Sequence, residues 1–110
     1  MKIAHEIYEK QKIYKYINEF LVSREFNGDK CSRYDLTIVL KDFPCWEESE
    51  KLTINFLGIK DLKLNNIENL FQVCFNINDI SEWQLEKLKY YVKENENNMF
   101  SFMCNDIKIS

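Results

Sequence analysis

The sequence has few of the residues that build flexible linkers, phosphate-binding loops and membrane spans. Its 110 residues include two glycines and one proline, so long flexible linkers are not expected. A phosphate-binding loop needs several glycines close together, and Gly28 and Gly58 stand far apart. No run approaches the roughly 18 uninterrupted apolar residues of a membrane helix. Because 45% of the residues are hydrophobic, the chain is expected to fold as a single domain over residues 1–110.

Residues that commonly supply catalysis are also scarce. His5 is the only histidine, so a Ser–His or Cys–His nucleophile or a two-histidine metal site would depend on it. Its position in the first turn of an expected helix favours an ordinary surface residue instead. The 18 acidic residues allow many carboxylate pairs, but no pair stands in a context that marks it for acid–base catalysis. The sequence therefore predicts no enzyme activity.

The cysteines are spaced too widely for a zinc site. Gaps of 14, 29 and 30 residues separate them, whereas structural zinc sites use close pairs such as Cys-x-x-Cys. We therefore predict no metal and no cofactor. A chain of this size does not need covalent staples, so free thiols are favoured over disulfides. The four cysteines are Cys31, Cys45, Cys74 and Cys104.

Charge and the first residues indicate the kind of partner and compartment. The 15 basic residues include two arginines and are outnumbered by 18 acidic ones, which leaves a net charge of −3. A nucleic-acid-binding protein usually carries a basic stripe rich in arginine, so nucleic acid is not expected as a partner. Charged residues follow Met1 too closely for a signal peptide. We therefore expect a cytoplasmic protein that does not bind membranes.

Hydrophobic periodicity predicts one helix followed by strands. Apolar residues at helical spacing begin at Ile3, and the helix is expected over about 2–16. Apolar residues at every second position then predict strands that bury one face. The fold class is α+β, an N-terminal helix packed on a mainly antiparallel meander sheet of about 6–7 strands. The expected strands are 18–26, 33–41, 52–56, 62–64, 71–79, 87–93 and 99–104, with Ile107 and Ile109 beyond the last.

Four details of this pattern can be tested by the structure. Asn27-Gly28 is a strong hairpin-turn signal, and Gly58 marks a bend between strands. Ser81 could cap a helix with apolar spacing at Leu85, Leu88 and Tyr91 or Val92, but a short turn leading into a strand over about 87–93 is favoured, followed by a loop that starts at Glu94. The apolar positions change parity after Cys104, which requires a bulge or tight bend at Asn105-Asp106.

Two loops place a tryptophan beside carboxylates. Aromatic side chains often dominate binding energy, and carboxylates would attract a basic partner. The plainer interpretation, which we favour for each loop separately, is that each tryptophan packs on the core while the acids are solvated. If both loops lie at the same edge of the sheet, they form one acidic, aromatic surface. The candidate partner-binding residues are Trp46, Glu47, Glu48 and Glu50 in the first loop and Asp79, Glu82 and Trp83 in the second.

Three segments of residues 33–109 resemble a group of small bacterial proteins. Some members of this group are similar to immunity proteins of polymorphic toxin systems of Gram-positive bacteria. The resemblance implies a non-catalytic protein that binds and neutralises a cognate toxin domain, and it transfers no catalytic residues. The segments are Phe56-Leu57-Gly58-Ile59-Lys60-Asp61-Leu62, Tyr90-Tyr91-Val92-Lys93-Glu94-Asn95-Glu96 and Ser101-Phe102-Met103-Cys104-Asn105-Asp106-Ile107.

The main functional hypothesis is an immunity-type interaction protein whose acidic, aromatic loops bind a toxin domain. The alternative is a small-molecule binding module with a pocket between helix and sheet, suggested by the surplus of aromatic residues. The sequence does not define the oligomeric state, although an edge strand at 18–26 or 105–109 could pair across a homodimer.

Overall fold

The computed structural model describes residues 2–42, 50–65, 72–83, 88–95 and 98–109. These residues form one α-helix, one 3-10 turn and eight strands. In chain order the elements are α1 (Lys2–Lys10), β1 (Tyr16–Asn27), β2 (Lys30–Lys41), β3 (Lys51–Leu57), β4 (Lys60–Leu64), β5 (Phe75–Asp79), η2 (Ser81–Trp83), β6 (Tyr90–Glu94), β7 (Phe100–Cys104) and β8 (Asp106–Ile109).

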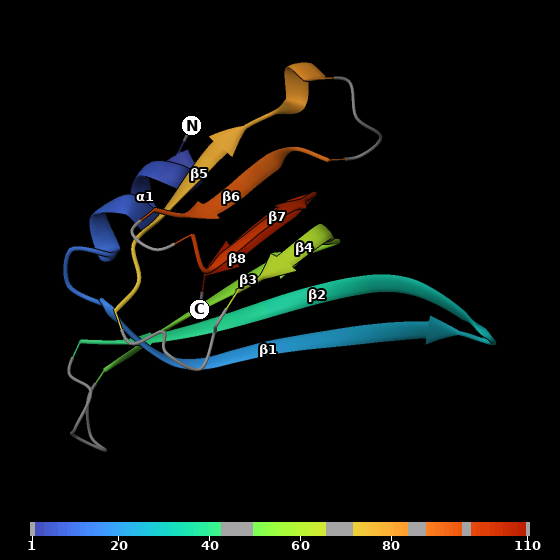
Figure 1. The fold of residues 1–110 in the computed structure, drawn as a ribbon, viewed down its shortest axis with the longest axis horizontal. Coiled ribbons are helices and arrows are strands. Elements are labelled where there is room, and N and C mark those ends of the chain that lie inside the picture. Colours follow the sequence, from blue (N-terminus) through green and yellow to red (C-terminus); the bar gives the residue numbers. More distant parts are fainter. Residues whose placement is uncertain (1, 43–49, 66–71, 84–87, 96–97, 110) are drawn as a thin grey trace.

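The eight strands of the described residues form two antiparallel sheets of four strands each. The first has the order β1-β2-β3-β8 and the second β4-β7-β6-β5. Helix α1 lies beside β5 (Figure 1), and its Ile7 is fully buried in the core. The predicted α+β fold with an N-terminal helix on antiparallel strands is confirmed. The division of the strands between two sheets was not predicted, because periodicity identifies a strand but not its neighbours.

Both sheets contribute aromatic rings to one core. Phe56 of β3 lies with its ring centroid 4.9 Å from that of Phe102 and 6.1 Å from that of Phe75, and both contacts are edge-on. Edge-on packing is a favoured arrangement of aromatic pairs. The alternation predicted for β3 is confirmed, since Leu52, Ile54 and Phe56 are buried while their neighbours are not. These rings hold the two sheets together.

The helix predicted over 2–16 ends at Lys10. A turn follows it, in which Tyr14 N–H donates to Lys10 O at 2.9 Å. Just after the helix, the side-chain amide of Gln11 pairs with the backbone of Phe75: its Nε2 donates to Phe75 O at 3.0 Å, and its Oε1 accepts from Phe75 N–H at 2.9 Å. Tyr14 and Ile17, which continued the helical spacing, pack on the core from the turn and from β1.

Strand β5 begins at Phe75, later than the predicted start at Phe71, which lies outside the described residues. Gln72 forms an isolated bridge to Tyr16, and Cys74 O accepts from Asn95 N–H at 2.7 Å. These residues are extended but bond to several different segments, so they join no regular ladder. The predicted inward face is confirmed by the buried Val73 and Phe75.

The chain passes between the sheets at two corners that touch each other. At Gly58 it leaves β3 for β4, with a φ of +64°. At Asn105 it leaves β7 for β8, and Asn105 N–H donates to Leu57 O at 2.9 Å. Asp35 fixes the first corner by accepting from Gly58 N–H at 3.0 Å. The bend predicted at Asn105-Asp106 is confirmed. The parity of the buried residues changes there because β7 and β8 belong to different sheets.

Strands β1 and β2 form a hairpin that extends beyond its neighbours (Figure 1). β2 pairs with β3 only from Asp35, opposite Leu57, to Lys41. The outer part of the hairpin, beyond the Ser23–Asp35 pair, is therefore a two-stranded arm. The predicted turn at its tip is confirmed, and Gly28 has a φ of +68°.

The segment after β5 follows the favoured prediction. Ser81–Trp83 form a single 3-10 turn, and β6 covers Tyr90–Glu94. Glu94, expected in the following loop, instead ends β6 and is fully buried. Among the described residues of this segment, a short turn leads to a strand that begins at Tyr90, later than the predicted start near residue 87, while residues 84–87 lie outside the described part.

Candidate partner-binding site

The structure describes three of the seven predicted binding residues in full. Glu50, Asp79 and Glu82 are exposed. Trp46, Glu47 and Glu48 lie outside the described residues, as does the side chain of Trp83.

Glu50 accepts a hydrogen bond from the segment between α1 and β1. Tyr14 Oη donates to Glu50 Oε2 at 2.8 Å. This hydrogen bond raises the pKa of Tyr14, with smaller contributions from desolvation and from the charges of Glu50 and Asp42. The first loop therefore ends beside the start of β1, close to the Tyr16–Lys41 pair.

Asp79 closes a tight turn at the end of β5. Its Oδ1 accepts from the backbone N–H of Ser81 at 2.9 Å and from the Ser81 hydroxyl at 2.5 Å. These two bonds lower the pKa of Asp79. Opposite Asp79 lies Tyr90, whose pKa is raised by partial burial and then by the charges of Asp106 and Asp79. Asp79 therefore stays ionised and holds the turn that presents Glu82.

Glu50 lies far from Asp79 and Glu82 in the fold. Tyr16, near Glu50, pairs with Lys41 on one side and bridges to Gln72 on the other. The seven steps from Gln72 to Asp79 then carry the chain roughly 20 Å away at about 3.3 Å per residue, to η2 at the far end in Figure 1. Glu50 therefore shares no surface with Asp79 and Glu82, while a combined surface of the two loops stays a prediction because Trp46, Glu47 and Glu48 lie outside the described residues.

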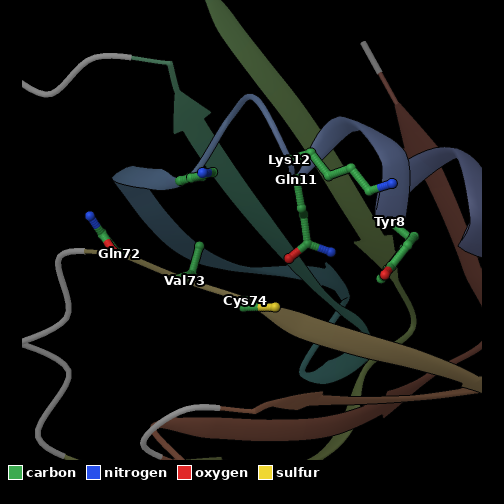
Figure 2. A pocket seen from close by; sticks show the side chains of 7 residues that line it. Tyr8, Gln11, Lys12, Gln72, Val73 and Cys74 are labelled. Carbon is green, nitrogen blue, oxygen red and sulfur yellow. The ribbon is translucent and has the colours of Figure 1, made fainter.

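A cavity of about 340 Å³ separates α1 from the residues that precede β5. Figure 2 shows Tyr8, Gln11 and Lys12 on the helix side and Gln72, Val73 and Cys74 on the other. Lys15 also lines the cavity. The Gln11 amide is hydrogen-bonded to the backbone of Phe75. Lys12 Nζ lies 3.2 Å from Glu9 Oε2 and 5.2 Å from the centre of the Tyr8 ring. The cavity is polar on its helix side and contains one sulfur.

The described residues hold no arrangement suited to nucleophilic or metal chemistry. His5 is exposed on α1. Burial raises the pKa of the Cys104 thiol to about 12, so this thiol stays protonated. Cys74 is a free, partly buried cysteine. Within the described ranges, no three His, Cys, Asp or Glu residues are grouped as a metal site would need. Nothing helical among those residues is both long and apolar enough to cross a membrane.

Sequence reasoning missed the pairing of Gln11, and it named the edge strand at 18–26 without singling out its exposed apolar side chains. Gln11 carried no signal, because its partner is a backbone group 64 residues away. The apolar surface of β1 did carry one: Phe20, Leu21 and Val22 are consecutive apolar residues, and a strand cannot bury both of its faces on one core. Leu21 and Val22 are indeed exposed.

Comparison with known proteins gives one match. The family model described as immunity protein PIM8 matches residues 2–110. No curated protein and no solved structure gives a significant match. The matched segment includes α1 and all the strands described above, as well as the resemblance segments that meet at the two corners. The chain belongs to the immunity protein PIM8 family.

Proposed function

We propose that this protein binds a cognate toxin domain in the cytoplasm and neutralises it without catalysis. The observation that carries the proposal is the match of an immunity-protein family to residues 2–110. An immunity protein needs a surface that fits its toxin, and it needs no reactive groups of its own. The exposed lone histidine and the protonated Cys104 agree with that requirement.

We further propose that acidic and aromatic loop residues make the contact. The net charge of −3 and the exposed carboxylates would favour a basic partner and speed its encounter. Since Glu50 lies far from Asp79 and Glu82, we assign the main role to the first segment, whose Glu50 lies near the start of β1, and a separate, secondary role to the second. The first comprises Trp46, Glu47, Glu48 and Glu50, and the second comprises Asp79, Glu82 and Trp83.

The experiment is titration calorimetry with an inactivated toxin domain encoded by the adjacent gene. We expect a complex at micromolar concentration or below, with an affinity that falls as salt is raised, because salt screens charge attraction. Reversing Glu47, Glu48 and Glu50 to lysine should weaken binding and remove much of the salt dependence. No complex between the wild-type chain and this toxin domain would overturn the proposal.

Two matched variants locate the contact. Glu6→Lys changes an exposed acid on α1 that lies 4.0 Å from Lys10 Nζ, and it should leave binding unchanged. Glu82→Lys changes an exposed acid at the opposite end of the strands and should have a smaller effect than the triple reversal. If Glu82→Lys has the larger effect, the main contact lies at the η2 end.

The cavity between α1 and the segment before β5 supports a second candidate function, the binding of a small molecule. Its volume of about 340 Å³ falls within the range of ligand sites, roughly 300–1,000 Å³. Lys12 and Lys15 at its rim would suit an anionic ligand. A thermal-shift screen of small carboxylates and phosphates tests this: stabilisation that is lost in Lys12→Ala/Lys15→Ala would support it, and no stabilisation by any compound would count against it.

A further inference from the structure

The two sheets have four edge strands, and they are not equally protected from pairing with another chain. An edge strand presents unpaired N–H and C=O groups, and proteins usually shield such edges with charge, bulges, short length or a covering element. On β5 the shield is Gln11, whose amide pairs with both backbone groups of Phe75. Helix α1 also contacts this strand. The β5 edge is therefore partly covered.

Strands β4 and β8 carry other protections. β4 has five residues, of which Lys60 and Lys63 are lysines, and its pairing is irregular between them. Asp61 at that irregularity has a φ of +56°, a conformation that a regular strand does not contain. β8 has four residues and includes Lys108. Short length and lysine make both edges poor templates for a further strand.

Strand β1 is the longest of the four edge strands, and its middle is the least shielded. It is twelve residues long and contains neither lysine nor proline, but it carries Glu19, Arg24 and Glu25. Among the described residues, β1 pairs with β2 on one side and forms the isolated Tyr16–Gln72 bridge on the other. Its ladder to β2 is irregular between Ile17 and Glu19 and again between Glu25 and Phe26, so the stretch 20–23 between them has neither a charged residue nor an irregularity.

The side chains of β1 add apolar surface to this open edge. Leu21 is 54% exposed, Val22 45% and Phe26 62%. Leu21 pairs with Thr37 and Val22 with the buried Leu36, so these two side chains lie on opposite faces of the sheet. A strand added beside β1 would therefore gain apolar contacts on both of its faces as well as main-chain hydrogen bonds.

We infer that an extended segment of the toxin domain pairs with β1 and becomes the fifth strand of the first sheet. This inference rests on the proposed toxin-binding function and identifies its docking surface. Strand addition draws affinity from main-chain hydrogen bonds and specificity from alternate side chains. β1 starts beside Tyr14, which donates a hydrogen bond to Glu50, so this carboxylate lies close to the start of the open edge.

A second copy of the chain is the competing occupant of this edge. Two copies of β1 related by a two-fold axis would be antiparallel, and directly opposed residues would then share a face. Glu19 pairs with Val39 and lies on the outer face, whereas Arg24 pairs with Tyr34 on the other face. Glu19 and Arg24 therefore cannot meet in such a dimer, and self-pairing would gain no ion pair between them.

The test compares lysine substitutions at two edges. Leu21→Lys and Phe26→Lys place a charge on β1, and Leu64→Lys places the same charge on β4, where Leu64 is 47% exposed. We expect the two β1 variants to bind the inactivated toxin domain about tenfold more weakly. Leu64→Lys should stay within about twofold of wild type. Urea unfolding of all three variants checks that each remains folded.

Amide hydrogen exchange provides a readout that does not depend on substitution. In an edge strand every second N–H points away from the sheet, so toxin binding should slow exchange at alternate residues between Glu19 and Arg24. If the toxin binds but the β1 variants and these amides are unaffected, strand addition is wrong while the immunity role stands.

Two further outcomes would also overturn the inference. If the wild-type chain does not bind the toxin domain at all, the proposed function falls and this inference falls with it. If sedimentation shows a dimer that Leu21→Lys dissociates, while toxin binding is unchanged, the edge belongs to a second copy.

Discussion

Gly58 and Asn105 lie next to each other at the two corners where the chain passes between the sheets. Gly58 leads from the first sheet to the second, and Asn105 leads back. A Cβ atom added to Gly58 would lie 3.1 Å from Asn105 Cγ and 3.1 Å from Asn105 Nδ2. A side chain at Gly58 would therefore require Asn105 to shift by a few tenths of an ångström, and the φ of +64° also favours glycine. The resemblance segments at residues 56–62 and 101–107 contain these two corners.

Gly58→Ala should destabilise the protein by about 2 kcal/mol, from backbone strain at positive φ and from the contact with Asn105. Gly28→Ala is the matched control, because Gly28 also has a positive φ but has open space around it. We expect the control to cost about 1 kcal/mol. Urea unfolding monitored by tryptophan fluorescence measures both. Equal losses would show that the contact with Asn105 contributes nothing.

Gln11→Ala should cost about 2 kcal/mol, because it removes both hydrogen bonds to the buried Phe75 backbone. Gln72→Ala provides the comparison: its exposed side chain makes one long bond of 3.4 Å to Tyr16 Oη. That variant should change the free energy of unfolding by less than about 0.5 kcal/mol. Similar losses in the two variants would contradict the role assigned to Gln11.

Ser81→Ala should raise the pKa of Asp79 toward its ordinary value, because the Ser81 hydroxyl is the largest cause of its depression. Since the folded-state pKa of Asp79 is lowered, its contribution to stability is present above the unfolded-state pKa and is lost as pH falls through the folded-state value. Wild type should therefore lose slightly more stability on acidification than Ser81→Ala. A carboxyl chemical-shift titration by NMR measures the pKa, and an unchanged value in the variant would contradict the assignment.

Cys104 should resist thiol reagents in the folded protein. Burial raises its pKa to about 12, and the thiolate is the reactive form. Iodoacetamide labelling at mild alkaline pH, read by peptide mass spectrometry, should modify Cys104 only after urea is added. Rapid native labelling at Cys104 would show that β7 opens far more readily than its burial implies.

Elements with an unambiguous period were predicted well from sequence. β3 follows its alternation residue by residue, and the parity change after Cys104 located the second corner. The helix end was not predictable from apolar spacing, because Tyr14 and Ile17 continue that spacing although they pack on the core from the turn and from β1. Periodicity also cannot say which strands are neighbours, so the division into two sheets required the pairing itself.

The candidate site was less predictable than the fold for the same reason. Whether Glu50 and Asp79 share a surface depends on strand direction and register, which neither residue encodes locally. The open edge of β1 depends on what the other segments fail to cover. Its one local sign was the run Phe20-Leu21-Val22, which has more apolar side chains than one sheet face can bury.

The position of β8 sets an order on folding during synthesis. β8 pairs with β3, and the four strands of the other sheet are made between them. A ribosome that has produced β1, β2 and β3 therefore carries a three-stranded sheet, with the ring of Phe56 still lacking both Phe75 and Phe102. Chains in this stage expose an apolar face and two open edges, a state prone to association. For this chain, nascent-chain aggregation should therefore be most severe before β8 is synthesised.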